Sequence, residues 1–171
     1  MTSASEFKAM RQTFVPERVS LVFVLESPPL NHGFVYDARG RTSEVLFRAF
    51  MRLIGASPIN KYDGLMMLRE RGWVLTNATY IPVNKMPDRA ADELIRNDYE
   101  SFKKDLLTIL GGDKTKPLLL VKKNIFTELA PRLREDGFVV ANTNFIPFPL
   151  HYHANQFQTQ VSQILKELGI R

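Results

Sequence analysis

The chain has 171 residues, of which 44% are hydrophobic and 24% are charged, and it contains no cysteine. The missing cysteines exclude a disulfide framework, a cysteine nucleophile, a thiolate zinc site and an iron–sulfur cluster. The 23 lysines and arginines exceed the 18 aspartates and glutamates, and the resulting net charge of +5 permits a polyanionic partner without proving one.

Length and composition predict one globular domain that covers residues 1–171. No run approaches the roughly 18 apolar residues that a membrane span requires. Residues 1–14 show no apolar stretch of the signal-peptide kind. We therefore expect a soluble, cytoplasmic monomer with no membrane partner.

Four short apolar runs predict strands that are buried on both faces of a parallel sheet. These runs are residues 21–25, 73–75, 118–121 and 138–141. Helical patterns occupy residues 43–54, 64–71, 88–110, 124–134 and 155–168, with Asp63 and Asp88 as the expected N-caps of the second and third. Because strands alternate with helices, the sequence predicts an α/β fold, a three-layer α/β/α sandwich around a central, mostly parallel four-stranded sheet.

Polar residues directly follow the first predicted strand, at the sheet edge where open α/β proteins bind ligands. Glu26, Ser27, Pro28 and Pro29 form a loop that is stiff because proline fixes φ. Glu26 can act there as a partly desolvated base, or it can cap backbone amides in a tight turn. The loop alone does not decide between these two interpretations.

Asn77 follows the second strand, where a carboxamide must satisfy one acceptor and two donors. It either bonds neighbouring loops or binds a ligand with a complementary edge, such as the carbonyl beside an N–H of a pyrimidine. Taken by itself, the position favours the structural role.

Residues 142–153 follow the fourth strand and combine prolines, aromatics and two of the three histidines in the chain. Stiff backbone at Pro147 and Pro149, beside His151 and His153, suits base stacking and phosphate contact. The two histidines could also belong to a metal pair, but no third ligand has a suitable spacing, so we expect no metal site.

In chain order, these strand ends resemble the uracil-DNA glycosylase superfamily over residues 20–168. The first motif of that family, Gly-Gln-Asp-Pro-Tyr-His-Gly or Gly-Glu-Ala-Pro-Gly, is similar to residues 25–29. Its central strand, Gly-Val-Leu-Leu-Leu-Asn-Ala, is similar to residues 72–78, which places Asn77 on the base-recognising asparagine. Its second motif, His-Pro-Ser-Pro-Leu, aligns with residues 146–150, and Phe34 is similar in place to the aromatic that stacks on the flipped base.

The chain departs from the family at several functional positions. Ser27 stands where some branches have the Asn or Asp that positions water, and Pro29 stands where a tyrosine blocks methylated pyrimidines. Ile146 replaces the histidine that donates to the leaving base, with His151 or His153 as the candidate substitute from the same loop. The Gly-Glu-Ala-Pro-Gly branch, whose glutamate matches Glu26, often carries four iron–sulfur cysteines that are absent here.

The resemblance implies a DNA-base N-glycosylase that flips a uracil-type base and hydrolyses its glycosidic bond without a cofactor. Glu26 would position or deprotonate the water, with Ser27 auxiliary. DNA phosphates would contact the loops around Pro28, Pro147 and Pro149 and the cations Lys85, Arg89, Lys122 and Lys123, although each cation fits a solvated face equally well.

Two other functions stay open. The runner-up is a non-catalytic nucleic-acid or nucleobase-binding module on the same fold. The less favoured one is a hydrolase of a small nucleoside or nucleotide that uses Glu26. A shallow basic cleft would favour DNA as the partner, whereas a closed polar pocket would favour a small ligand.

Overall fold

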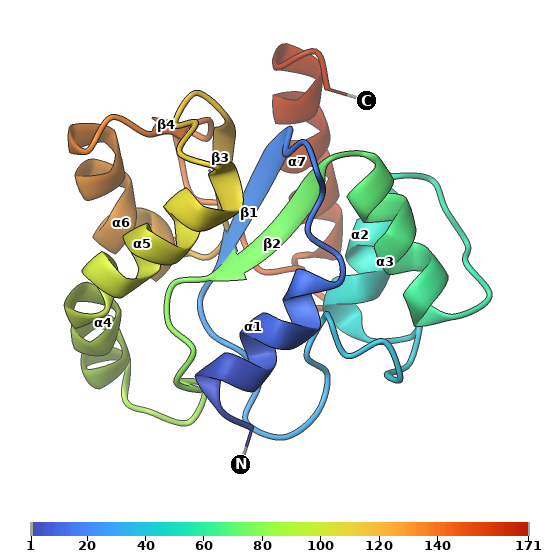
Figure 1. Cartoon of the computed structure of the whole chain (residues 1–171), viewed down its shortest axis with the longest axis horizontal. Helices are drawn as coiled ribbons and strands as arrows, with labels where there is room; N and C mark the ends of the chain where they lie inside the picture. Colours follow the sequence, from blue (N-terminus) through green and yellow to red (C-terminus); the bar gives the residue numbers. More distant parts are fainter. Residues whose placement is uncertain (1, 171) are drawn as a thin grey trace.

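A computed structural model describes residues 2–170, and a four-stranded sheet forms its centre (Figure 1). The strands are β1 (Leu21–Leu25), β2 (Trp73–Asn77), β3 (Pro117–Leu120) and β4 (Val139–Val140). All neighbouring pairs are parallel, in the order β2-β1-β3-β4. Every residue of β1 and β2 is buried, as expected for strands with helices on both faces. The same prediction is wrong for β4, a two-residue edge strand in which Val139 is 44% exposed.

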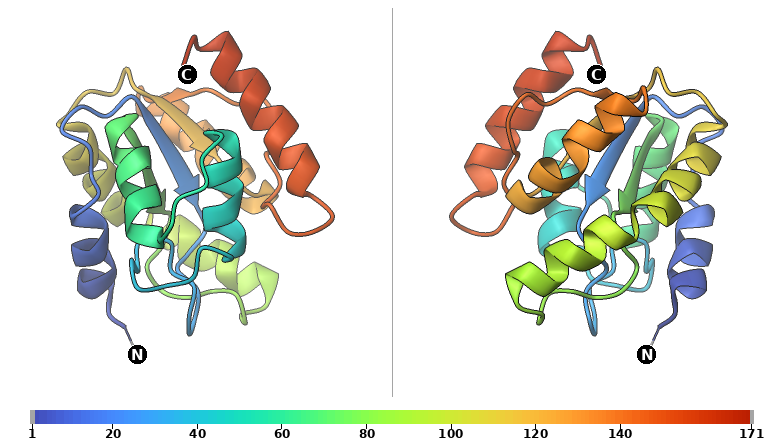
Figure 2. Two further views of the ribbon diagram at one scale, coloured as in Figure 1. Left: turned by 90° about the vertical axis from the view of Figure 1, so that its right-hand side faces the viewer. Right: turned by 90° about the vertical axis from the view of Figure 1, so that its left-hand side faces the viewer.

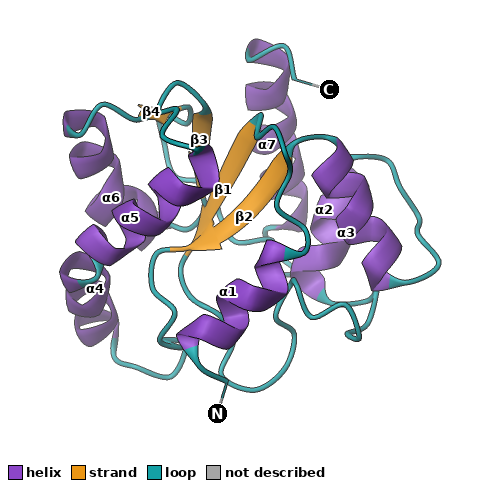
Figure 3. Cartoon of the chain, in the orientation of Figure 1, coloured by secondary structure: helices purple, strands orange, loops and turns teal. Residues whose placement is uncertain are grey.

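Helices cover the two faces of this sheet (Figure 3). They are α1 (Ala4–Gln12), α2 (Val45–Leu53), α3 (Lys61–Glu70), α4 (Asp88–Asn97), α5 (Tyr99–Leu110), α6 (Lys123–Glu135) and α7 (Ala154–Glu167). One layer contains α2, α3 and α7, the opposite layer contains α4, α5 and α6, and α1 lies beside the edge strand β2 (Figure 2). The predicted three-layer α/β/α sandwich with a parallel sheet is therefore confirmed.

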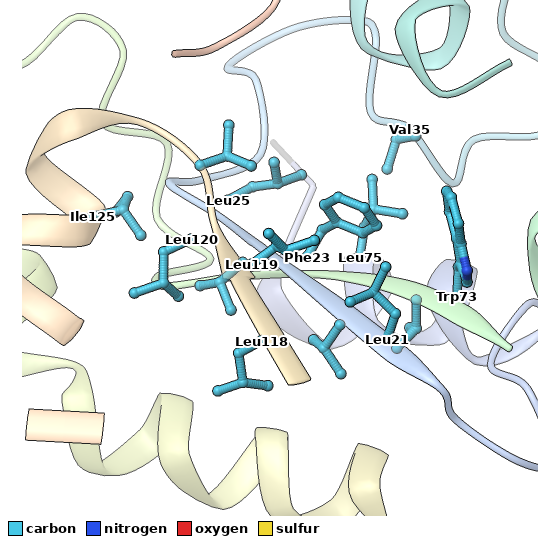
Figure 4. Packing of buried hydrophobic residues seen from close by; sticks show 14 of the residues in the cluster. Leu21, Phe23, Leu25, Val35, Trp73, Leu75, Leu118, Leu119, Leu120 and Ile125 are labelled. Atoms are coloured by element: carbon cyan, nitrogen blue, oxygen red, sulfur yellow. The ribbon is translucent and has the colours of Figure 1, made fainter. Parts of the chain in front are cut away.

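The core lies between the sheet and these two helical layers (Figure 4). Leu21 and Phe23 of β1 are fully buried, as is Leu119 of β3, and Trp73 of β2 is 1% exposed. The Phe23 ring packs edge-on against Phe50 of α2, with 4.6 Å between the ring centroids. Burial on this scale fixes the strand ends, because each strand that carries a site residue is anchored by apolar side chains.

The prediction of one long helix over residues 88–110 is wrong, because the helix breaks at Asp98. Asp98 ends α4 and begins α5 with φ −81° and ψ −2°. Its carboxylate accepts a 2.6 Å hydrogen bond from the Thr79 hydroxyl, in the loop after β2. This bond ties the break to the carboxyl end of the sheet, an effect that helical periodicity does not reveal.

Two predicted N-caps are also wrong. Asn60, not Asp63, caps α3, and its side chain accepts from the Asp63 backbone amide. Pro87 precedes α4, so Asp88 lies inside the first turn and the helix has no side-chain cap. Both aspartates still sit where a carboxylate interacts favourably with the helix dipole.

The N-terminal helix α1 was not predicted, although the sequence contains a signal for it. Ser3 and Glu6 form a capping box in which each side chain bonds the backbone of the other. Arg11 of α1 is 4% exposed and donates two hydrogen bonds to Asp105 of α5, at 2.7 and 2.8 Å. It also donates to Thr76 of β2 at 2.9 Å, so one buried cation joins α1 to the sheet.

Among residues 2–170, no helix combines the length and the apolar character needed to cross a bilayer.

Candidate functional site

The register of the sheet brings Glu26 and Asn77 to the same edge. Leu25 and Asn77 are paired across β1 and β2, and Glu26 follows directly after Leu25. The backbone ladder continues past the strand ends, because the Ala78 and Thr79 amides donate to the Leu25 and Glu26 carbonyls at 2.8 and 3.1 Å. The first two predicted site residues therefore sit on rigid, paired backbone.

A cavity of about 400 Å³ opens at this edge. It is called the base cavity below, after the ligand that the sequence resemblance predicts. Its walls include seven of the predicted site residues, Glu26, Ser27, Pro28, Pro29, Phe34, Asn77 and Lys122. Phe148 and Leu150, from the loop after β4, complete the wall. Most of the lining is apolar, with a few polar groups at fixed places, which is typical of sites that bind a small organic molecule.

Glu26 is held by side chains from the end of β3 and the start of α6. Its Oε2 lies 2.5 Å from Lys122 Nζ, and its Oε1 accepts a 2.7 Å hydrogen bond from Asn124 Nδ2. The carboxylate is 14% exposed. No backbone amide of residues 2–170 donates to it, so Glu26 is not the turn cap that the sequence left open.

Lys122 has an unusual backbone, with φ 86° and ψ 144°, and it is the only non-glycine residue of the chain between 2 and 170 with positive φ. Such a conformation suits glycine and costs another residue about 1–3 kcal/mol. Its side chain is 45% exposed. The Glu26 side chain is only 14% exposed, so the pair is partly buried. The backbone strain at Lys122 therefore opposes the stabilisation that the pair provides.

Asn77 is 5% exposed and lies in the wall of the base cavity. Within residues 2–170, its carboxamide makes no hydrogen bond of normal geometry. Burial raises the pKa of the Tyr80 phenol, an effect that is partly opposed by the Arg11 charge and by hydrogen bonding to Thr76 and Asn77. The Asn77 carboxamide therefore lies between the base cavity and the Tyr80 hydroxyl, which accepts a hydrogen bond from Arg11.

Phe34 is fixed by a buried lysine that sequence reasoning missed. Lys61 of α3 has no exposed side-chain surface, and its Nζ donates to the Phe34 carbonyl at 2.7 Å and to Glu44 at 2.5 Å. The Phe34 ring also packs on Phe7 of α1, with the centroids 4.7 Å apart. No local pattern marks Lys61, because the pairing joins segments that only the fold brings together.

The hydroxyl of Ser27 forms hydrogen bonds with the backbone of two loops. It accepts from the Val83 amide at 3.2 Å and donates to the Pro28 carbonyl at 3.2 Å. Ser27 thus holds the loop after β1 against the loop after β2, which positions Glu26 beside the cavity.

Other predicted residues lie away from the base cavity. His151 and His153 are exposed, as are Lys85 and Arg89, and none of the four lines it. Pro147 and Pro149 are buried, so they stiffen the loop that carries Phe148 into the cavity wall. Ile146, aligned with the family histidine, is 1% exposed and forms a bridge to Val121.

A second cavity, of about 420 Å³, adjoins the base cavity at Glu26 and Lys122 and is more polar. Lys123 and Asn124 line it, together with the acidic residues Asp88, Asp92 and Glu128. No cluster of three His, Asp or Glu side chains within residues 2–170 is placed to hold a metal ion.

Comparisons with protein-family models, curated proteins and solved structures give no match to this chain.

Proposed function

We propose that the protein is a DNA-base N-glycosylase that hydrolyses the bond between a flipped, uracil-type base and its sugar. The observation that carries the proposal is the convergence of Glu26, Phe34 and Asn77 on one largely apolar cavity at the carboxyl edge of the sheet. A base in a duplex cannot reach such a cavity unless it is extruded from the stack.

Two side chains would bind the base. Phe34 offers an aromatic ring for stacking, held in place by the Lys61 bond to its carbonyl. Asn77 offers one acceptor beside two donors, which matches the N–H and the carbonyl of uracil but not the reversed polarity of cytosine. Pro29 is shorter than the tyrosine that excludes a 5-methyl group in the family, so the substrate range would include 5-substituted uracils.

The chemistry requires one bond to break and one to form. The bond between the anomeric carbon and the base nitrogen breaks, and its electron pair stays with the base. Water then forms a bond to the anomeric carbon, and its proton goes to the Glu26 carboxylate. The departing base anion takes a proton from solvent. Glu26 would also stabilise the positive charge that develops on the sugar.

Surface cations would supply the contact to the DNA backbone. Lys123 lines the second cavity, and Lys85 and Arg89 are chain neighbours of residues that line it. The net charge of +5 agrees with a polyanionic partner. Such contacts would position DNA without reading its sequence.

A non-catalytic module that binds a nucleobase is the second candidate. It is favoured by the engagement of both Glu26 carboxylate oxygens, by Lys122 and Asn124. It is also favoured by the apolar Ile146 at the position of the missing histidine. The third candidate, a hydrolase of small nucleosides, has less support because a mostly apolar wall leaves few partners for sugar hydroxyls.

The deciding experiment is incubation of the full-length chain with oligonucleotides that each carry one modified base, followed by alkali cleavage at abasic sites. The panel includes uracil, thymine and 5-hydroxymethyluracil, in single and double strands, and a parallel arm contains free nucleosides. Base release by the wild-type chain and not by Glu26→Gln supports the glycosylase. Base binding without release supports the module, and cleavage of nucleosides alone supports the third candidate.

A further inference from the structure

Lys122 is the only cation, among residues 2–170, in the wall of the base cavity. The other charged groups in that wall are the carboxylates of Glu26 and Glu44. His32, His151 and His153 are exposed and do not line the cavity. Among the side chains that line this cavity, Lys122 is therefore the one that can offer positive charge to a base anion.

The hydrogen bonds that residue 122 makes through its backbone do not require a lysine side chain. Its backbone amide donates to the Ile146 carbonyl at 2.6 Å, and its carbonyl accepts from Phe126 at the start of α6. Glycine would make both bonds and would adopt φ 86° without strain. A lysine is therefore needed here only for its contact with Glu26 and for its place in the cavity wall, and the backbone strain that it carries points to a function.

We propose that Lys122 stabilises the negative charge on the departing base, in place of a neutral histidine donor. This inference rests on the proposed function and assigns the electrostatic part of it to one residue. When the glycosidic bond breaks, the electron pair moves to the base and the Lys122 ammonium stabilises the resulting anion. Lys122 keeps its proton, and solvent protonates the base after release.

The pair with Glu26 favours a charge role over a nucleophilic one. An ammonium has three donors and no free electron pair, and in that form it binds the carboxylate at 2.5 Å. A Schiff base with the sugar would require the neutral amine. Lys122 therefore acts through its charge.

The test compares Lys122→Gly and Lys122→Arg with the wild-type chain, using two free pyrimidines as probes. Uracil is neutral at neutral pH, whereas barbiturate has a similar ring and is an anion. Calorimetry should show that the wild-type chain prefers barbiturate by about ten-fold or more, as expected for a charged hydrogen bond in a cavity. Lys122→Arg should keep the preference, and Lys122→Gly should lose it while keeping a cooperative melting transition.

The outcomes separate the two proposals. Loss of the preference in Lys122→Gly supports the role of Lys122, whether or not an oligonucleotide is cleaved. Absence of oligonucleotide cleavage would refute only the glycosylase. An equal preference in Lys122→Gly and wild type overturns the role of Lys122, whatever the activity. A covalent adduct trapped by borohydride on a substrate oligonucleotide, and absent from Lys122→Gly, also overturns it, because it identifies a nucleophile. Binding of neither pyrimidine overturns the role of Lys122, whereas the glycosylase is still decided by base release from the oligonucleotides.

Discussion

The Lys122 ammonium and the Glu26 carboxylate meet 2.5 Å apart, at the carboxyl ends of the neighbouring strands β3 and β1. The pair lies at the junction of the base cavity and the second, more polar cavity. Heterolysis of a glycosidic bond creates a negative base and a positive sugar, so two opposite charges at one junction can each face the charge that they stabilise.

Glu26→Gln should abolish turnover with little effect on the fold. The amide keeps an oxygen that can accept from Asn124, but it cannot take a proton from water, and general-base catalysis is worth about 10²–10⁴-fold in rate. The measurements are the rate of abasic-site formation and the melting temperature. Glu70→Gln, at the exposed end of α3, is the control and should retain the wild-type rate. A Glu26→Gln protein with wild-type turnover would remove the carboxylate from the mechanism.

DNA binding should weaken steeply as salt rises. Each phosphate that the protein neutralises contributes a slope of about −0.9 to a plot of log affinity against log salt on duplex. Reversing the charges of Arg89 and Lys123 should lower affinity for every sequence and should make that slope shallower by about one for each phosphate that the protein no longer neutralises. Lys166→Glu, near the end of α7, is the matched control. Fluorescence anisotropy with a labelled oligonucleotide measures both quantities, and an unchanged slope would place the two cations on a solvated face.

Much of the fold was predictable because apolar patterning determined it. The runs at residues 21–25 and 118–121 are continuous in valine, leucine and phenylalanine, which is the signature of strands buried on both faces. Because the predicted strands alternate with helices along the sequence, the three-layer sandwich was predictable as well. The break at Asp98 was not predictable, because helical periodicity continues through it and the hydrogen bond that Asp98 accepts from Thr79 forms only in the folded chain.

The site was predictable in part, for the same reason. Glu26 follows β1 directly and Asn77 ends β2, and parallel α/β sheets bind ligands at the carboxyl ends of their strands, so the two residues could be placed together. The pairing of Lys61 with Glu44 and the positive φ of Lys122 had no sequence signal. They depend on tertiary contacts and on backbone strain, and neither property follows from residue type or spacing.

Stability should fall in acid as the pair between Asp105 and Arg11 is broken. Burial raises the pKa of the Asp105 carboxyl, but the hydrogen bonds and charge of Arg11 outweigh it, so the pKa is lowered overall. The carboxylate therefore contributes its full stability above the unfolded pKa, about pH 4, and loses it as the pH falls through the lower folded value.

Asp105→Asn tests this linkage. At neutral pH it leaves the Arg11 guanidinium buried beside a neutral amide, which should cost about 3–5 kcal/mol of unfolding free energy. In urea titrations the difference from wild type should shrink at about pH 3 and below. Asp113→Asn, which removes an exposed carboxylate, should change little at neutral pH. A deficit that is the same at every pH would show that the pair is not the origin of the acid sensitivity.

Asn77→Ala should remove base recognition and leave the fold intact. The Asn77 carboxamide lines the base cavity and lies beside the Tyr80 hydroxyl, which keeps its hydrogen bond from Arg11 when the amide is removed. Loss of its bonds to a pyrimidine edge is worth about 1–3 kcal/mol per group, so affinity for uracil should fall about ten-fold or more. Asn142→Ala is the matched control, because Asn142 is also buried but bonds the Leu120 amide, the Leu120 carbonyl and the Asn144 carbonyl at 2.9, 3.0 and 2.9 Å. It should melt several degrees lower, since a loss of about 1–3 kcal/mol is large beside the stability of a domain of this size, and its remaining folded fraction should bind uracil normally. The opposite pattern, in which Asn77→Ala melts lower and binds uracil as the wild type does, would make Asn77 a scaffold residue and remove base reading from the proposed function.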